Sequence, residues 1–440
     1  MARRLSQRTL KLVLVQLLLY HCTCSAEVNG ILTLADAVKR GLAQDSAVTR
    51  SVLAELISQK DVEISRAAFS PRLEGQLGSL FTSSSLSPSS PHEPSFLGAN
   101  AIWEHKALLV LTGQLDTSGS LRAGVHKSKA QKEVASADTM IAKLDLGLLL
   151  SQTYLEASFA KQKRELSEQL LETAVQLRMN TQMRLSAGEV ARVDLVKAEL
   201  QESLAQDQLS QALTTEETTR HTLLSLLCME PGSEPNLLAL GSLLQEADKS
   251  TPVADLGHDR PILKKLDSQA RSAEADLELA KAELRPQLNY SLRSGLITDG
   301  FGNSSIPQHL GVEGLISVSF PLFDGGTSAL KQEQARLRLE QVETDRRITE
   351  RQIDADRRNA LTKLSRTRNR MENLAAELPQ ARKNFEISYA RYKAGEAQIV
   401  EVTDAQNSLT NFSQAHLQAV YDYLAAQIVY QRTIGLVPGL

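Results

Sequence analysis

Apolar residues recur along most of the chain at the three- and four-residue spacing of an amphipathic helix. The longest such pattern runs from about 128 to 185, and a second runs from about 328 to 394 with Pro379 inside it. Helices of this length need partners along their whole length, and we expect Pro379 to kink the second one. Return helices are predicted over about 192–228 and 399–435.

Four shorter segments alternate apolar and polar residues with a period of two, which is the pattern of β-strands with one polar face. The expected strands are Arg72–Phe81, Trp103–Leu115, Leu288–Ser294 and Val312–Leu322. Helices over 34–68, with a break near Gly41, and over 261–284 precede the first and third strands. The sequence therefore predicts a mixed α and β fold that is mainly helical.

Each long helical pattern ends in an Ala-Gly-Glu turn, at Gly188 and at Gly395, and a return helix starts at once. Glycine is the usual residue just past a helix end, because it takes positive φ without a Cβ penalty. The two glycines are 395 − 188 = 207 residues apart in a chain of 440. This spacing indicates a tandem duplication, with a first repeat over 27–230, a linker over 231–260 and a second repeat over 261–440.

The N-terminus has the pattern of a signal peptide. Basic residues precede an apolar run from Leu12 to Tyr20, and Cys24-Ser-Ala26 provides a cleavage site of small residues, so we expect the signal to span 1–26. The apolar run is about half of the ~20 residues that a bilayer-spanning helix needs. The mature chain is therefore expected to be exported.

Cysteine usage bounds the redox chemistry. Cys22 and Cys24 leave with the signal peptide, although the sequence leaves open whether one of them is lipidated. Cys228 is then the one thiol of the mature chain, so no intrachain disulfide can form. Its position between Leu227 and Met229 at the end of a helix predicts a small, buried apolar side chain.

Composition excludes several classes of function. The 4% aromatic content beside 42% hydrophobic residues favours long helices packed through small side chains. A net charge of −3 argues against a nucleic-acid partner, and the arginines between 346 and 370 alternate with acids, as on a solvated helix face. His92 and His105 flank the first outer loop without further metal ligands nearby. We expect no metal site, no cofactor and no enzymatic activity.

The mature chain contains no apolar run long enough for a transmembrane helix, whereas strands of about ten residues can cross a membrane within a closed barrel. Four strands cannot close even the smallest barrel, which has about eight, so several chains must share one. Aromatic residues near the strand ends suit the membrane interfaces; they are Phe69, Phe81, Trp103, Tyr290, Phe320 and Phe323.

Several motifs keep the order found in one family of channels. Beside the two Ala-Gly-Glu turns, they are Asp194-Leu-Val-Lys-Ala, Glu401-Val-Thr-Asp-Ala-Gln406, Phe323-Asp-Gly-Gly326 and Tyr423-Leu-Ala-Ala-Gln427. Together they make the chain resemble the TolC-type outer-membrane efflux proteins, also called outer membrane factors. The resemblance covers essentially the whole mature chain. It implies a homotrimer in the outer membrane of a Gram-negative-type bacterium, with four strands per chain in a shared twelve-strand β-barrel and the helical hairpins in an α-barrel tunnel through the periplasm.

The resemblance also implies the function and the partners. The protein would be the exit duct of a multi-component efflux or type I secretion system, bounded by outer-membrane lipid and joined to a periplasmic adaptor protein and an inner-membrane pump. The turns at Gly188 and Gly395 would form the periplasmic mouth, where these partners dock and where the channel is gated.

Site residues follow from the matched positions. In the family, acids on the return helix after the second tip ring the constriction, and Glu401 and Asp404 stand at those positions. Such a ring favours cations over anions. Asp194 and Tyr392 match a pair that links the two hairpins in the closed state. At Ala397 the chain departs from the family pattern, which has an arginine that makes a second link.

One alternative from another class remains at this stage. A periplasmic coiled-coil adaptor would share the long helices without itself spanning the outer membrane, but it would not need the four alternating segments. Within the channel hypothesis, the cargo can be small toxic compounds, metal ions or a secreted polypeptide, because the inner-membrane partner usually selects it.

Overall fold

The computed structural model describes residues 31–44, 46–81, 103–230, 232–249, 260–298 and 310–439. The expected signal peptide over 1–26, the first outer loop with His92, part of the linker and the side chain of Trp103 lie outside this description. The elements are β1 (Ile31–Leu32), α2 (Leu34–Ala43), α3 (Ala47–Ala67), β2 (Arg72–Phe81), β3 (Trp103–Leu115), α4 (Ser120–Ser186), α5 (Arg192–Leu226), β4 (Asn236–Leu237), α6 (Leu240–Lys249), α7 (Pro261–Ala282), β5 (Gln287–Thr298), β6 (Leu310–Ser319), α8 (Thr327–Lys393) and α9 (Ile399–Thr433).

The chain divides into two compact units, each built from segments of both halves of the sequence. The helical unit comprises Met1–Arg50, Met140–Arg260 and Arg351–Leu440, and the sheet unit comprises Ser51–Thr139 and Pro261–Glu350. Among the described helices, none is both long enough and apolar enough to cross a bilayer. The fold is mainly helical with few strands, as the periodicity of the sequence predicts.

The long helices keep the spacing of the two glycines. Helices α4 and α8 have 67 residues each, α5 and α9 have 35 each, and their starts are 327 − 120 = 207 and 399 − 192 = 207 residues apart. Helix α8 continues through Pro379 to Lys393. Equal lengths at equal spacing mean that the two hairpins present the same side-chain positions at their tips.

Helix α4 begins eight residues earlier than the sequence predicts, at Ser120 instead of about 128. The cause is Asp116, whose carboxylate accepts the backbone N–H of Leu121 at 3.0 Å and of Arg122 at 3.3 Å and so satisfies free donors of the first turn. Burial alone would raise the pKa of Asp116, but these bonds and the Arg122 guanidinium outweigh it and hold the pKa below its usual value.

The first helical region also differs from its predicted form. The break falls after Ala43 instead of at Gly41, which lies buried within α2. A Cβ on Gly41 would lie 2.4 Å from a methyl carbon of Leu150, so this glycine allows α4 to approach closely. The last strand, β6, ends at Ser319 and not at Leu322.

The prediction that Cys228 is buried is wrong, because its side chain is exposed. Cys228 has a φ of 49° and follows the end of α5, where the N–H of Met229 bonds back to the carbonyl of Leu224 at 2.9 Å. Gly435, 207 residues later, ends α9 in the same way with a φ of 91°. The neighbouring Leu227 fills the core instead. Sequence periodicity cannot show this one-residue choice at a helix end.

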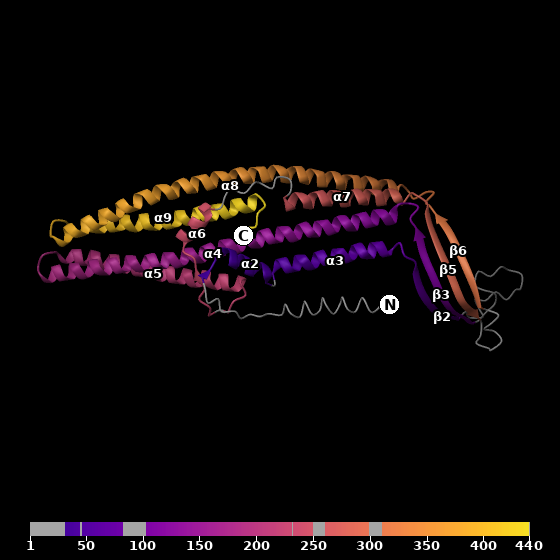
Figure 1. Cartoon of the computed structure of the whole chain (residues 1–440), viewed down its shortest axis with the longest axis horizontal. Helices are drawn as coiled ribbons and strands as arrows, with labels where there is room; N and C mark the ends of the chain where they lie inside the picture. The colour runs from indigo at the N-terminus through magenta and orange to yellow at the C-terminus, as the bar shows by residue number, and fades with distance from the viewer. Residues whose placement is uncertain are drawn as a thin grey trace. The chain divides into compact units, whose positions relative to one another are not determined.

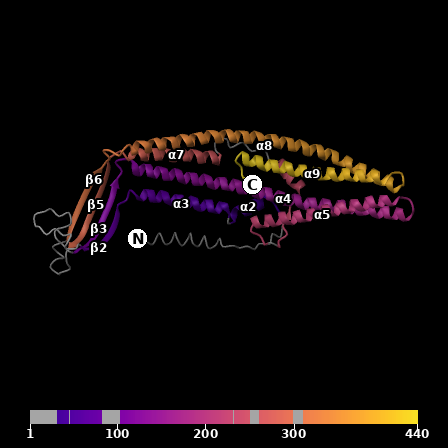
Figure 2. The same cartoon turned by 180° about the vertical axis from the view of Figure 1, so that it is seen from behind.

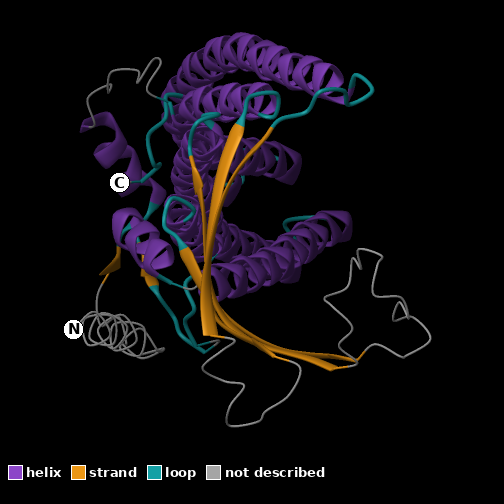
Figure 3. Cartoon of the chain, turned by 90° about the vertical axis from the view of Figure 1, so that its right-hand side faces the viewer, coloured by secondary structure: helices purple, strands orange, loops and turns teal. Residues whose placement is uncertain are grey.

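The sheet unit contains the antiparallel sheet β2-β3-β5-β6 (Figures 1 and 2). Paired residues in such a sheet lie on the same face. The register places Leu73 opposite Leu111, Leu111 opposite Leu292, and Leu292 opposite Gly314. One face is therefore largely apolar and the other largely polar, and Figure 3 shows the strands twisting about one another.

The core of the helical unit forms around Tyr154, which is fully buried. Its hydroxyl donates to the carbonyl of Leu32 at 2.6 Å and accepts the N–H of Leu238 at 3.0 Å. These bonds fix the parallel pair of β1 and β4, in which Leu32 faces Leu237. This pairing of an N-terminal segment with the segment after α5 has no signal in the sequence, because each strand has two residues.

Candidate functional site at the helical tips

Both tips have the same backbone turn. The N–H of Gly188 bonds to the carbonyl of Leu185 at 3.0 Å, and the N–H of Glu189 bonds to the carbonyl of Arg184 at 2.9 Å. The second tip repeats these bonds around Gly395, and the two glycines have φ values of 78° and 81°. This double bond pattern is a Schellman motif, which requires positive φ just past the helix end.

Above the turns, the four helices pack around one aromatic side chain. The tip cluster consists of Leu177, Ala198, Tyr392, Ile399 and Val402, one or two residues from each helix. Tyr392 is 1% exposed. Because its neighbours come from α4, α5 and α9, its ring holds the first hairpin against the second.

Polar bonds between α4 and α8 reinforce this packing. The hydroxyl groups of Thr181 and Tyr392 lie 3.0 Å apart, and Thr181 donates its own proton to the carbonyl of Leu177 at 2.9 Å. Tyr392 is therefore the donor of the pair. One helical turn further from the tip, the side-chain amide of Asn180 donates to the hydroxyl of Tyr389.

Arg184 makes the most contacts across the two tips. Its guanidinium carbon lies 4.7 Å from the centre of the Tyr392 ring, in cation–π geometry, and Nη1 donates to the Tyr392 carbonyl. Nε pairs with Glu189 at 3.0 Å. One side chain thus fixes the second tip to the first.

The predicted constriction acids lie on the outer side of α9. Glu401 and Asp404 are exposed and stand one turn apart, while Val402, Thr403 and Ala405 beside them are buried. Their side chains therefore point away from the tip cluster, as a pore-lining position requires.

The structure adds a cation to this acidic pair. A guanidinium nitrogen of Arg391 lies 3.2 Å from a carboxylate oxygen of Glu401, with both side chains about half exposed. Arg391 also donates to the carbonyl of Glu396 at 3.4 Å. Sequence reasoning missed both tip arginines, although each stands four residues before its glycine, which is the signal that would have shown them.

A comparison with known families decides the class of protein. The family model for outer membrane efflux proteins matches residues 40–228 and 255–435. The chain belongs to this family. It is accordingly an outer-membrane efflux channel protein, and the family consists of channels, not enzymes.

Relatives and solved structures agree with this assignment. Nodulation protein T of Rhizobium leguminosarum bv. trifolii is 24% identical over 341 residues, which cover 74% of this chain and 71% of the relative. Pyoverdine export outer membrane protein OpmQ of Pseudomonas putida is 22% identical over 73% of this chain and 68% of its own. The structure is similar to that of CusC, with a TM-score of 0.82 at 15% identity over 95% and 96% of the two chains. It is similar to the channel OprN with a TM-score of 0.81 at 18% identity over 91% and 89%.

The family match selects an outer-membrane channel over the periplasmic adaptor that the sequence left as an alternative. It does not test the roles of individual residues. The Tyr392 hydroxyl bonds to Thr181 here, while the Asp194 side chain makes no hydrogen bond or ion pair with any described residue. The gate link between Asp194 and Tyr392 stays a prediction. Ala397, where the family pattern has arginine, packs against the tip cluster.

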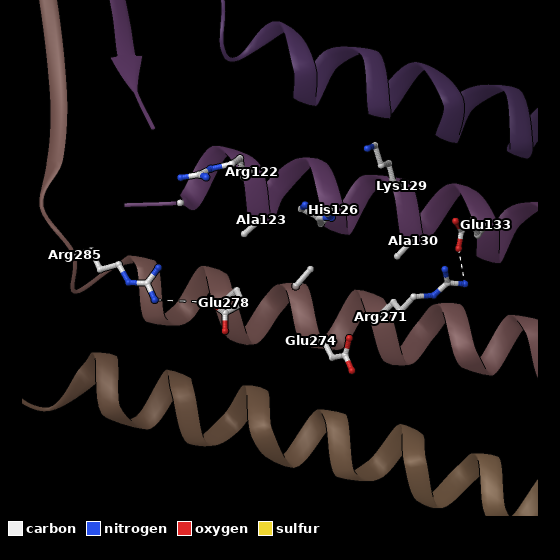
Figure 4. Close-up of a pocket in the computed structure, with 12 residues that line it drawn as sticks. Arg122, Ala123, His126, Lys129, Ala130, Glu133, Arg271, Glu274, Glu278 and Arg285 are labelled. Carbon is white, nitrogen blue, oxygen red and sulfur yellow. Dashed lines mark ion pairs between the residues drawn. The ribbon is translucent and has the colours of Figure 1, made fainter. Parts of the chain in front are cut away.

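A second hollow lies in the sheet unit of this efflux protein, between the start of α4 and α7 (Figure 4). It encloses about 590 Å³. Its arginines are held by neighbours, since Arg271 pairs with Glu133 at 2.6 Å and Arg285 donates to the carbonyl of Ser118 at 3.0 Å. The hollow is therefore a groove laced with ion pairs, and none of the predicted site residues lines it. Over the described ranges, no three His, Cys, Asp or Glu residues gather as metal ligands.

Proposed function

We propose that three copies of the chain form the exit duct of a multi-component efflux or type I secretion assembly. The open sheet supports this assembly. Strands β2 and β6 are its two edges, and each carries backbone groups without a partner strand within the described chain. Neighbouring copies would pair these edges, because only a closed barrel satisfies every backbone group in lipid.

The apolar face of the sheet supplies the surface that lipid would cover. Leu77 on β2 is 87% exposed, and Val312 and Ile316 on β6 are 72% and 75% exposed. Residues this apolar are rarely so exposed at the surface of a protein in water, and their shared face matches the lipid side of a barrel strand.

The observation that carries the gate proposal is the exposed acid pair at the tip. Glu401 and Asp404 point away from the tip cluster on the helix that starts at the second turn. In three copies arranged around an axis, these carboxylates would ring the periplasmic mouth and favour cations. Asp194 and Tyr392 would link the hairpins in the closed state.

Partners follow the same proposal. The tips at Gly188 and Gly395 would dock a periplasmic adaptor, which joins the duct to an inner-membrane pump. Two relatives carry pyoverdine export in their names, which supports an export role without indicating the cargo of this chain. The partner in the inner membrane would select that cargo.

The assembly is tested by the mass of the native particle. The mature protein is extracted from isolated outer membranes in mild detergent, and the protein mass of the particle is measured by light scattering. We expect a mass of three chains. A single-chain particle from the same membranes would contradict the shared barrel.

The gate is tested by ion selectivity. We expect Glu401→Ala with Asp404→Ala to abolish cation preference in planar bilayers, measured as the reversal potential in a salt gradient. Unchanged reversal potentials with an intact trimer would refute the constriction. Glu217→Ala on the exposed middle of α5 serves as the control, because it removes the same charge away from the tip.

A further inference from the structure

Two arginines occupy equivalent positions in the repeats and make different contacts. Arg184 and Arg391 are 207 residues apart, as are Asp194 and Glu401 (391 − 184 and 401 − 194). In the second tip, Arg391 pairs with Glu401 at 3.2 Å. In the first tip, Arg184 contacts Glu189 and the Tyr392 ring, and Asp194 is left without an ion pair in the described chain.

The difference has a cause at one neighbouring position. Arg184 lies over Tyr392, which belongs to the other hairpin. The repeat equivalent of Tyr392 is Leu185 (392 − 207), which has no aromatic ring. Arg391 therefore has no matching ring to cover on the first hairpin. It turns back across its own tip to Glu401.

We propose that Arg391 sets the charge of the constriction by neutralising Glu401, so that Asp404 is the uncompensated carboxylate of each chain. This inference rests on the proposed constriction. Glu401, Asp404 and Arg391 together leave one net negative charge per chain instead of two. Asp404 makes no side-chain hydrogen bond or ion pair with other residues in the described ranges.

The role of this pair is electrostatic. Both side chains are about half exposed, and ion pairs of this kind contribute little to stability. Their field nevertheless reaches about 10 Å at 0.1 M salt, which is comparable with the width of a narrow pore. Arg391 is thus a specificity-determining residue of the mouth.

The experiment is a set of charge variants in planar bilayers. The full-length channel is purified from outer membranes, and the permeability ratio of K⁺ to Cl⁻ is taken from the reversal potential near 0.1 M salt. We expect Arg391→Gln to raise the ratio by about two- to fivefold. Glu401→Gln should lower it by a similar factor, because Arg391 is then unpaired.

The decisive variant combines Arg391→Gln with Glu401→Gln. Loss of a neutral pair should bring the ratio back to within about twofold of the unmodified channel. If the double variant instead matches Glu401→Gln alone, Arg391 has no effect on the pore and the inference is wrong. If neither this set nor Glu401→Gln with Asp404→Gln changes the ratio, the constriction itself is wrong.

Arg382→Gln is the matched control. Arg382 is exposed on the same helix, nine residues before Arg391, and makes no hydrogen bond or ion pair among the described residues. Nine residues of helix separate the two side chains by roughly 14 Å, beyond the screening length. A response equal to that of Arg391→Gln would mean that overall charge, and not the pair with Glu401, sets the selectivity.

Discussion

The hydroxyl of Tyr392 donates to Thr181 at 3.0 Å, across 211 residues of sequence. This bond joins the last turns of α4 and α8, so it couples the two hairpins next to their tips. The first prediction concerns this bond. Tyr392→Phe keeps the buried ring but removes the donor, and we expect a loss of about 1 kcal/mol in the coupling of the hairpins. Faster amide hydrogen exchange in peptides over 385–395 would report it.

The same variant tests the predicted link to Asp194. If Asp194 binds the Tyr392 hydroxyl in the closed channel, Asp194→Asn and Tyr392→Phe should each raise the conductance, and the double variant should add nothing further. Single-channel recording measures this. Additive effects, or no effect of Asp194→Asn, would show that Thr181 is the functional partner of Tyr392.

A second prediction concerns Arg184. Lysine keeps the charge but cannot bind a ring, a carbonyl and a carboxylate with one planar group. We expect Arg184→Lys to weaken the tip by about 1–2 kcal/mol and to speed exchange in peptides over 385–395 roughly tenfold. Arg192→Lys is the control, because Arg192 is exposed at the start of α5 and makes no side-chain bond within the described chain. Equal exchange in both variants would contradict the role of Arg184.

A third prediction concerns the sheet. Gly113 pairs with Tyr290, whose ring lies over it, and a Cβ on Gly113 would be 2.3 Å from the tyrosine oxygen. We expect Gly113→Ala to displace the ring at a cost of about 1–3 kcal/mol and to lower the yield of folded channel in the outer membrane. Gly75→Ala has open space within 4 Å and should leave the yield unchanged. Similar losses for both variants would point to backbone propensity as the cause.

A fourth prediction concerns pH. Burial lowers the pKa of His416 on α9 from its ordinary value of 6.5. Below that pH the unfolded chain binds a proton that the folded chain resists, so stability falls as the pH drops through and below about 6.5. His416→Gln should flatten this loss in thermal unfolding at pH 7.5 and 5.5. His221→Gln, at an exposed position on α5, is the control. A variant that loses as much stability as the unmodified channel would exclude His416 as the cause.

Sequence periodicity predicted the long helices, the four strands and the two tips. It succeeded because these features depend on local chemistry, such as the φ of 78° at Gly188 and 81° at Gly395. It erred where a side chain from outside the pattern decides a boundary. Asp116 extends α4 by its cap, and the turn at Cys228 exposes the thiol while Leu227 enters the core.

The sequence by itself thus determined the family, the duplication and the positions of the two tip acids, since all of these depend on the order and spacing of residue types. Only the tertiary structure decided what the equivalent arginines do. Arg184 and Arg391 stand at identical offsets from their glycines, yet one lies over Tyr392 and the other pairs with Glu401. Their difference depends on which hairpin presents an aromatic ring, and such a contact exists only when segments 207 residues apart pack together.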